Sequence, residues 1–588
     1  MTELVLGISA FYHDSAAALV ANGVPIAAAQ EERFSRRRHD PAFPEQAVRY
    51  CLREAGVGLG DVEAVAHYED PVPKFQRVMA TYVGAAPRGY QVFRDTLPDW
   101  LFSKRKVAAE AHDRLSDLNL GRVPEAQCRP HHESHAMSAF LASPFESAAV
   151  LCVDGVGHWA TTTIWHGRGT SLRNVAEIRF PHFLGLLYSA FTYFCGFKVD
   201  SGEYKLMGLA PYGRPRYADV IRDKLIDVKS DGSFRLNLRH FEFLRGQLMT
   251  GRAFEKLFDG PRRVPESPLT ERQFDLAASV QKVLEEVLVR LARTSGELTG
   301  ESTLCLAGGV ALNCVANGRI AREAGFDELW IQPAAGDAGG ALGAAMAVAM
   351  ERGATRPWLD DGQNAMSGSL LGPSFSDEDI GSYLDGQAIP YEYVGPEGIA
   401  ERVAEALADK KIVGWFHGRM EFGPRALGAR SILGDPRDPG MQTAMNLKIK
   451  FGESFRPFAP SVLADEAKDY FDLTQASPYM LMVSKIADAQ QLGGVDTAGL
   501  TGLDLLRVPR STIPAVTHVD CSARVQTVDG TANPPFHRLL TAFRELRYNT
   551  RRQHRHLSGH AERAHRHRRQ PRRPRSGSHL DRRRSTAS

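Results

Sequence analysis

The chain has 588 residues, of which 43% are apolar and 24% charged, and its formal net charge is +3. This length favours two domains, and the composition is that of a folded globular protein, which excludes a fibre or a wholly disordered chain. No apolar stretch is long enough to span a membrane, and the N-terminus lacks the features of a signal peptide. Seven scattered cysteines indicate a reducing compartment, so we expect a cytoplasmic protein with no membrane partner.

Two stretches of the first half carry the same order of predicted strands. In each stretch a buried-type strand is followed by a second strand, a short turn and a third strand. The first set comprises Leu4–Ser9, Ser15–Val20 and Pro25–Ala29, with a helix at Pro44–Ala55, and the second comprises Ala148–Val153, Ala160–Trp165 and Arg173–Ile178. The recurrence predicts a duplicated α/β lobe.

Residues 70–120 are predicted to be helical and are rich in aromatic side chains, which suits either a cap over a substrate pocket or plain packing surface. Next come a long helix at Gln273–Thr294 and strands at Thr303–Ala307 and Glu328–Gln332. The predicted domains are 1–355 and 377–546, joined by a Gly-, Pro- and Ser-rich linker at 356–376. The second domain is expected to hold a helix at Glu397–Lys410 and a strand at Ile412–Phe416.

Four residues have the types and positions of metal ligands. His131 and His135 are four residues apart, so on a helix they share one face about 6 Å apart. Asp154 closes a predicted strand, and Asp337 lies in a glycine-rich loop that opens a helix. Two imidazoles and two carboxylates suit a divalent metal with open positions, such as iron or manganese. The alternatives are a chance histidine pair and a helix N-cap at Asp337.

Two glycine loops could hold a nucleotide. Gly308–Asn313 and Gly336–Gly340 each lie between a predicted strand and a helix, where bare backbone and a helix N-terminus favour phosphate. Neither loop is a Walker A motif. In Asp200–Gly213, Glu203 could bind a ribose hydroxyl and Lys205 a phosphate, although an ordinary surface loop with an ion pair is the alternative.

Arginines gather in the second domain. Arg419, Arg425 and Arg430 lie within the loop-like segment Gly418–Ser431, and Lys448, Lys450 and Arg456 follow. Guanidinium groups suit phosphate or carboxylate ligands, whereas a solvated basic face is the alternative.

The last 42 residues, 547–588, carry a charge of about +12, which leaves the preceding 546 residues at about −9. We expect this Arg/His-rich tail to be disordered, because it has almost nothing apolar to bury. A nucleic-acid arm is one interpretation, but an acidic body is a poor partner for nucleic acid.

Several motifs in order resemble the O-carbamoyltransferases that modify antibiotics and nodulation factors. They are Gly7–Ala16, Glu31–Arg36, His131–His135, Glu203–Gly213, Gly308–Asn313, Gly336–Gly340, Gly418–Ser431, Phe455–Pro460 and His518–Gln526. The resemblance implies a duplicated actin/sugar-kinase-like N-terminal domain, similar to the tRNA threonylcarbamoyl-transferase. It also implies a smaller α/β C-terminal domain, similar to threonylcarbamoyl-adenylate synthase.

The resemblance further implies a two-step reaction: carbamoyl phosphate and ATP form carbamoyl-adenylate, and a hydroxyl of a small natural product then takes the carbamoyl group. By position it assigns His131, His135, Asp154 and Asp337 to a divalent metal, with iron favoured over manganese or magnesium. It places His13, Arg38 and Lys205 at the catalytic site. It assigns nucleotide and carbamoyl phosphate binding to Gly202, Glu203, Gly308, Gly309, Val310, Asn313, Gly336, Gly339, Arg419, Arg425, Arg430, Ser431, Lys450, Arg456 and Arg524. No nucleic-acid partner is implied, and a homo-oligomer is compatible with the sequence.

The chain departs from the family pattern at three places. Cys521 replaces a glycine, Phe183 replaces a serine, and after Leu546 the patterned sequence stops where the family has a strand, an Asn-rich loop and a helix. We hypothesise a frameshift near Leu546, which mass spectrometry of the native C-terminus would test. Two alternatives remain open: a fused tRNA threonylcarbamoylation enzyme, and a relic with a defective second domain.

Overall fold

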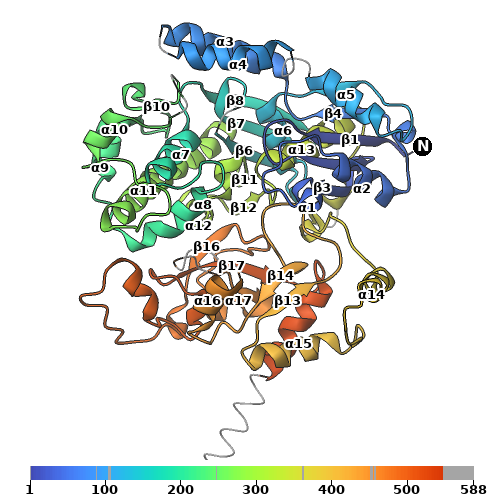
Figure 1. Cartoon of the computed structure of the whole chain (residues 1–588), viewed down its shortest axis with the longest axis vertical. Helices are drawn as coiled ribbons and strands as arrows, with labels where there is room; N and C mark the ends of the chain where they lie inside the picture. Colours follow the sequence, from blue (N-terminus) through green and yellow to red (C-terminus); the bar gives the residue numbers. More distant parts are fainter. Residues whose placement is uncertain are drawn as a thin grey trace, which may run out of the picture.

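A computed structural model describes residues 2–87, 89–102, 107–155, 157–244, 246, 248–359, 363–449, 455 and 458–546. The predicted tail at 547–588 lies outside these residues. Figure 1 shows a larger N-terminal domain above a smaller C-terminal one. In the part of the chain that the structure describes, no helix is long and apolar enough to cross a membrane.

The first lobe is built on a five-stranded sheet in the order β3-β2-β1-β4-β5. Strand β2 runs antiparallel to both β1 and β3, whereas β4 and β5 run parallel to β1. Every residue of β1 and β2 is buried, because both faces of this sheet are covered by helices. The strands are β1 Leu4–Ser9, β2 Ala16–Ala21, β3 Val24–Gln30, β4 Ala64–His67 and β5 Ala126–Cys128.

The second lobe repeats this topology. Its sheet has the order β12-β11-β6-β7-β8, with β6, β7 and β8 antiparallel and β11 and β12 parallel to β6. The strands are β6 Ser147–Val153, β7 Ala160–Arg168, β8 Ser171–Arg179, β11 Thr303–Ala307 and β12 Glu328–Ile331. The matching order confirms the predicted duplicated α/β lobe.

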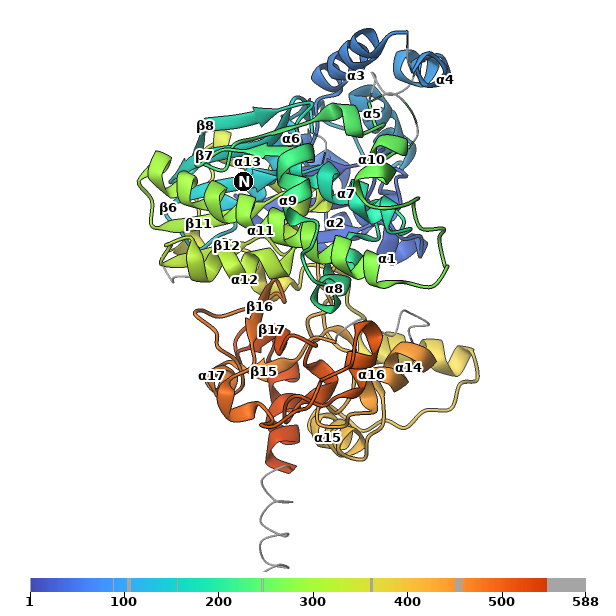
Figure 2. The ribbon, with the colours of Figure 1, turned by 90° about the vertical axis from the view of Figure 1, so that its left-hand side faces the viewer.

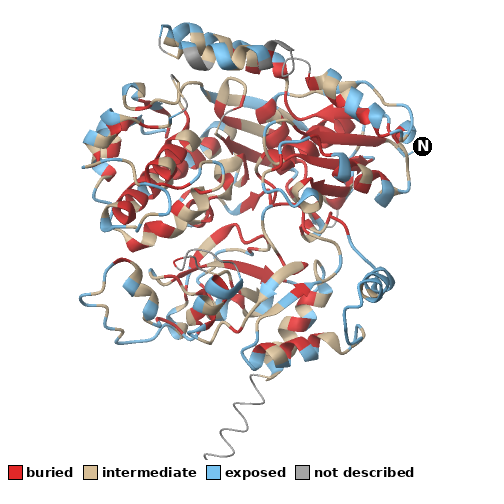
Figure 3. Ribbon diagram, in the orientation of Figure 1, coloured by how far each residue is buried: buried red, intermediate tan, exposed pale blue. Residues whose placement is uncertain are grey.

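Two helices separate the sheets. Helix α13 (Asp337–Glu351) packs on the first sheet and on α6 (His131–Phe140), which in turn packs on the second sheet. The approach is close enough to require glycine: a Cβ at Gly343 would lie 1.8 Å from the Ser134 carbonyl oxygen, and one at Gly7 would lie 1.9 Å from that of Ala341. Figure 3 shows burial concentrated in these sheets and helices.

The outer faces are covered by further helices. Helix α11 (Glu271–Thr299) covers the second sheet; it begins at a capping box between Thr270 and Gln273 and ends at Gly300 in the left-handed conformation. The remaining helices of this domain include α1 Glu32–Ser35, α2 Glu45–Ala55, α7 Leu184–Phe194, α8 Glu203–Leu209, α9 Ala218–Val220, α10 Arg252–Leu257 and α12 Cys314–Glu323, with a small hairpin of β9 Ile226–Val228 and β10 Phe234–Leu236.

The segment predicted to be helical and aromatic forms α3 (Pro71–Ala85), α4 (Tyr90–Phe102) and α5 (Val107–Asp117). Helices α3 and α4 pack against each other and project from the domain at its end remote from the C-terminal domain (Figure 2). Asp70 caps α3 by accepting a hydrogen bond from the Val72 backbone.

The C-terminal domain has two small sheets. Strands β13 (Val413–Phe416) and β14 (Arg430–Leu433) are antiparallel, and β15 (Ser461–Leu463), β17 (Ser522–Val528) and β16 (Met482–Lys485) form a mixed sheet in that order. Residues 534–546 are helical. The other helices are α14 Asp377–Gly386, α15 Ile399–Ala408, α16 Met441–Ala444 and α17 Ala467–Tyr470.

The predicted linker is not a free tether along its described length. Arg356 donates hydrogen bonds to the carbonyl oxygens of Phe140 and Leu141, and the Ala28 backbone donates to that of Leu371. The domains also meet directly, where Asn317 on α12 donates to the Leu481 carbonyl oxygen at 2.9 Å. The C-terminal domain is therefore held against the second lobe.

Candidate functional site

The four predicted metal ligands converge between the lobes. Helix α6 carries His131 and His135, Asp154 follows β6, and Asp337 is the first residue of α13. The Nε2 atoms of the histidines are 3.2 Å apart. Asp154 Oδ2 lies 2.9 Å from His131 Nε2, and Asp337 Oδ1 lies 3.4 Å from His135 Nε2. All four side chains are buried, and their ligand atoms lie within 4.8 Å of one another.

These residues fit a divalent cation. Two carboxylates and two neutral imidazoles would place two negative charges in a buried cluster, which a divalent ion would neutralise. Asp337 is not the helix N-cap, because Gly336 occupies that position and no side chain caps the helix. His135 Nδ1 is buried without a hydrogen-bond partner among the described residues. His135 therefore meets the other three residues through Nε2, the nitrogen that could bind an ion.

Further polar groups contact three of these four side chains and fix their orientation. His131 Nδ1 lies 3.2 Å from Glu69 Oε2, Tyr68 donates its hydroxyl to Asp337, and the Gly309 backbone donates to Asp154. Metal-binding histidines commonly face a carboxylate in this way. Burial opposes protonation of His131, but Asp154 and Glu69 outweigh it and raise the pKa of His131 to about 10. The acids around His131 therefore favour positive charge at this site.

His13 reaches this cluster from the turn after β1. Its Nε2 lies 3.7 Å from Asp337 Oδ2, and its Nδ1 lies 3.0 Å from Asp14. Asp14 also contacts His39 Nδ1 at 2.7 Å. Burial lowers the pKa of His13, but Asp337 and Asp14 more than compensate and raise it to about 10. His13 is thus placed to exchange a proton beside the metal ligands.

The other two predicted catalytic residues lie around α8. Arg38 donates a hydrogen bond to the Tyr204 hydroxyl at 3.4 Å, and the Lys205 ammonium lies 5.8 Å from the centre of the Phe197 ring. Nearby, Glu203 accepts hydrogen bonds from Ser189 and from the Gly202 backbone, and burial raises the pKa of its carboxyl group. Their catalytic and ribose-binding roles stay predictions.

The glycines of the two predicted phosphate loops differ in what requires them. Gly308 has φ +85°, and a Cβ there would lie 2.3 Å from the Val153 carbonyl oxygen. A Cβ at Gly339 would lie 2.1 Å from the Ala334 carbonyl oxygen, which is a packing requirement, whereas Gly336 has open space around it. Val310 lies in a short helical turn, and Asn313 caps α12 while pairing with Gln281.

The arginines of the second domain divide into two kinds. Arg430 is paired with buried Glu421 at 2.9 Å, and Arg419 donates to carbonyl oxygens of the first domain at Ile26 and Leu371. Arg425 contacts no carboxylate within 4 Å among the described residues; it donates instead to the Leu312 carbonyl oxygen at 3.1 Å. Burial, and then nearby Arg524, lower the pKa of Arg425 to about 10.

The structure describes two of the remaining residues that were predicted to bind anions, Ser431 and Arg524. Arg524 lies on β17, and its Nε atom, like that of Arg425, is buried without a hydrogen-bond partner. Ser431 accepts a hydrogen bond from the Gly428 backbone. Lys450 and Arg456 lie outside the described residues.

Sequence reasoning missed Glu69 and Lys74. Lys74 on α3 donates to Glu69 at 2.6 Å, and its ammonium lies 4.4 Å from the centre of the Tyr12 ring. The signal that identified Asp154, an acid following a buried strand, also applies to Glu69, which follows β4 after one residue. No sequence signal places Lys74 beside it.

Comparisons with known proteins agree on one family. The model of the carbamoyltransferase N-terminus matches residues 4–346, and that of the carbamoyltransferase C-terminus matches residues 404–550. The protein sll1178 of Synechocystis is 54% identical over 92% of this chain and 89% of its own length. Nodulation protein NolNO of Sinorhizobium fredii is 35% identical over 91% of this chain and 72% of its own.

More distant similarities are also found. Nodulation protein U of Rhizobium fredii is 29% identical over 93% of this chain and 88% of its own length. Among solved structures, a ROK hexokinase from Thermus thermophilus aligns with 60% of this chain and all of its own, at 15% identity and a TM-score of 0.28.

Proposed function

This chain belongs to the carbamoyltransferase family, and on that premise we propose an ATP-dependent transfer of a carbamoyl group to a hydroxyl of a small natural product. Carbamoyl phosphate would lose its phosphate to water, and the resulting carbamate would attack the α-phosphorus of ATP to give carbamoyl-adenylate and release pyrophosphate. In the second step the acceptor would receive the carbamoyl group and AMP would leave. Relatives that carry the name of nodulation proteins support an acceptor of this general kind.

The arrangement of Arg425 and Arg524 is the main support for the donor step. Two guanidinium groups close enough to affect each other repel unless an anion lies between them, and no carboxylate of the described chain takes that place. Guanidinium groups bind phosphate oxygens in pairs. Carbamoyl phosphate is an anion of suitable size, so we assign its phosphate to these two residues.

The acceptor step falls to His13. As the acceptor hydroxyl oxygen attacks the carbamoyl carbon, AMP leaves with the bonding electron pair and the hydroxyl proton passes to His13 Nε2, which must first release its own proton because Asp337 and Asp14 raise the pKa of His13 to about 10. Asp14 holds the opposite nitrogen of the ring at 3.0 Å and fixes its orientation. A divalent ion bound by His131, His135, Asp154 and Asp337 would supply Lewis-acid stabilisation of the carbonyl oxygen and an anchor for phosphate.

The contact between Arg425 and Leu312 suggests how the steps connect. Leu312 belongs to the glycine loop of the first domain, so the donor residues of the second domain face that loop directly. An intermediate prone to hydrolysis would then cross between domains without entering bulk water.

Carbamoyl-phosphate-dependent exchange of pyrophosphate into ATP tests the donor step. We expect exchange with the full-length chain and no exchange when carbamoyl phosphate is omitted. Incubation with a panel of hydroxylated scaffolds, followed by mass spectrometry for one added carbamoyl group, tests the transfer. Exchange that does not depend on carbamoyl phosphate would refute this function.

A further inference from the structure

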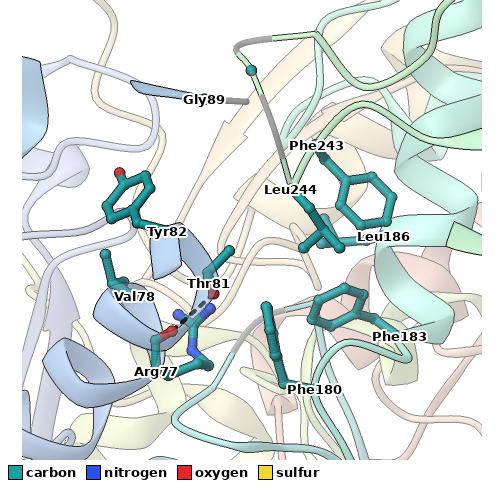
Figure 4. Close-up of a pocket in the computed structure, with 11 residues that line it drawn as sticks. Arg77, Val78, Thr81, Tyr82, Gly89, Phe180, Phe183, Leu186, Phe243 and Leu244 are labelled. Carbon is teal, nitrogen blue, oxygen red and sulfur yellow. Dashed lines mark hydrogen bonds between the residues drawn. The ribbon is translucent and has the colours of Figure 1, made fainter. Parts of the chain in front are cut away.

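A cavity of about 180 Å³ lies between the projecting helix α3 and the turn that follows β8. Figure 4 shows Val78, Thr81 and Tyr82 of α3 on one side and the rings of Phe180, Phe183 and Phe243 on the other. An engineered apolar cavity of about 150 Å³ holds benzene. The volume and walls of this cavity thus suit one six-membered ring with a small substituent.

Arg77 is the charged group of this cavity. Its side chain lies beside Phe180, with the guanidinium carbon 5.1 Å from the centre of that ring. Arg77 is 7% exposed, and its Nε atom is buried without a hydrogen-bond partner. Within the described residues no carboxylate approaches its guanidinium within 4 Å, because Glu69, the acid nearby, is taken by Lys74. A buried cation without a counter-ion is unfavourable, and a bound anion would relieve that cost.

The cavity adjoins the proposed catalytic site through α3. Lys74 lies one helical turn before Arg77, and it contacts both Glu69 and the ring of Tyr12. Glu69 in turn faces His131, and Tyr12 precedes His13. The Asp70 backbone, at the start of α3, donates to His158 in the turn after β6. A molecule seated beside Arg77 would lie one helical turn from Lys74, which contacts the residues next to His131 and His13.

Resting on the proposed function, we propose that this cavity selects the acceptor, and that the acceptor carries an aromatic ring with a carboxylate. The ring would stack among Phe180, Phe183 and Phe243, and the carboxylate would pair with Arg77. The acceptor hydroxyl would lie at the opposite end of the molecule, toward His13. The charge of Arg77 disfavours an amine at the same position, so polycationic acceptors would bind poorly in this cavity.

Three acceptors that differ at one substituent test the selection: para-carboxybenzyl, para-methylbenzyl and para-(aminomethyl)benzyl alcohol. With the full-length chain, carbamoyl phosphate and ATP, we expect kcat/KM for the carboxylate to exceed that for the methyl compound by about tenfold, and the amine to be poorest. Arg77→Met should remove the preference mainly through KM. Val78→Trp, which fills the cavity, should lower kcat/KM for all three.

Controls separate this selection from folding and from the proposed function. Arg173→Met, at an exposed arginine of β8 outside the cavity, should keep the wild-type order of acceptors. Arg77→Met should fold normally, since an apolar residue of similar length replaces an unpaired buried charge, and thermal unfolding checks this. Saturation-transfer NMR without ATP measures the binding of benzoate, benzyl alcohol and benzylamine. This measurement tests ligand binding in the cavity even if no carbamoyl transfer occurs.

The outcomes are distinct. Loss of carbamoyl-phosphate-dependent pyrophosphate exchange refutes the proposed function but leaves the benzoate measurement as a test of the cavity. Benzoate binding that is weakened about tenfold by Arg77→Met supports the inference. Equal binding of benzoate and benzylamine, or benzoate binding unaffected by Arg77→Met, overturns it.

Discussion

At the scale of single residues, Arg425 and Arg430 show how similar side chains in one loop differ in physical role. Arg430 neutralises Glu421, whose side chain is wholly buried, so it stabilises the loop. Arg425 has no such carboxylate in the described chain and lies near another arginine, so its charge is available to a ligand. Their sequence context, Gly418–Ser431, does not distinguish them, because the partner of each is set by folding.

Exchanging each arginine for methionine tests that difference. Arg430→Met should reduce the free energy of unfolding by about 3–5 kcal/mol, because Glu421 is left buried without its partner. Arg425→Met should leave the free energy of unfolding unchanged or raise it, while abolishing carbamoyl-phosphate-dependent exchange. Urea denaturation and the exchange assay measure the two effects. The reverse pattern would mean that Arg425 is structural.

The histidine pair gives a second prediction at this scale. His135→Ala removes one of the four ligand atoms, and we expect the metal content of purified protein to fall well below one ion per chain. Inductively coupled plasma mass spectrometry measures this, and His132→Gln, one residue beyond His131 but outside the ligand set, is the matched control. Full metal occupancy in His135→Ala would contradict the ligand assignment.

The ligand cluster was predictable because each member has a local signature, namely helical i,i+4 spacing or a position at a strand end. Glu69 has the same strand-end signature but was missed, since a single acid after a strand is common. Lys74 and Arg77 could not be predicted. Their relation to the site depends on how α3 docks, which is a long-range property of the fold.

At the scale of secondary-structure elements, glycines allow α13 to pack closely against its neighbours. Gly343 meets the Ser134 carbonyl oxygen on α6, and Gly340 meets the ring of Tyr68. Part of the predicted phosphate loop is thus explained by packing rather than by a ligand. Gly336 is different, because its surroundings are open and its φ of −75° suits any residue.

Alanine substitutions separate the two kinds of glycine. Gly343→Ala should push α6 away from α13, reduce the free energy of unfolding by about 3 kcal/mol or more, and lower the metal content. Gly336→Ala should change the free energy of unfolding by less than about 0.5 kcal/mol. A loss of ATP affinity in Gly336→Ala, measured by calorimetry, would then support a phosphate cradle; unchanged affinity would remove Gly336 from the predicted nucleotide site.

Strands and long helices were predicted within a few residues. Thr303–Ala307 agrees at both ends, and the predicted helix Gln273–Thr294 extends to Glu271–Thr299 because its caps lie further out. The segment Asp200–Gly213 forms α8, whereas its many glycines and prolines suit a loop equally well. Short helices of this kind are determined by the surfaces they pack on.

At the scale of the whole molecule, part of the C-terminal domain shares the apolar core of the first domain, while its other buried residues form separate clusters. Met480, Leu481 and Met482 of the second domain belong to the same buried cluster as the sheets of the first. Asn317 bridges the domains by donating to the carbonyl oxygens of Ala311 and Leu481. The sequence predicted two domains but not this shared core, because the apolar pattern of a strand does not reveal which domain it contacts.

The shared core predicts that the domains unfold together. Differential scanning calorimetry should show one transition, and Asn317→Ala should lower its midpoint while reducing the free energy of unfolding by about 1–3 kcal/mol, since buried carbonyl groups lose their donor. Glu323→Ala, at an exposed residue of the same helix whose carboxylate pairs with Arg319 of that helix, should have an effect of about 0.5 kcal/mol or less. Two well-separated transitions in the wild type would contradict this coupling.

The repeated strand order also relates the positions of the four candidate metal ligands. Helix α6 follows the fifth strand of the first lobe, and α13 follows the corresponding strand of the second, so His131 and Asp337, each the first residue of its helix, occupy equivalent positions. The four side chains thus come from both lobes, and His131 and Asp337 are related by the approximate twofold symmetry of the two sheets. The first lobe supplies only imidazoles to the set of four and the second only carboxylates, so neither lobe alone completes it.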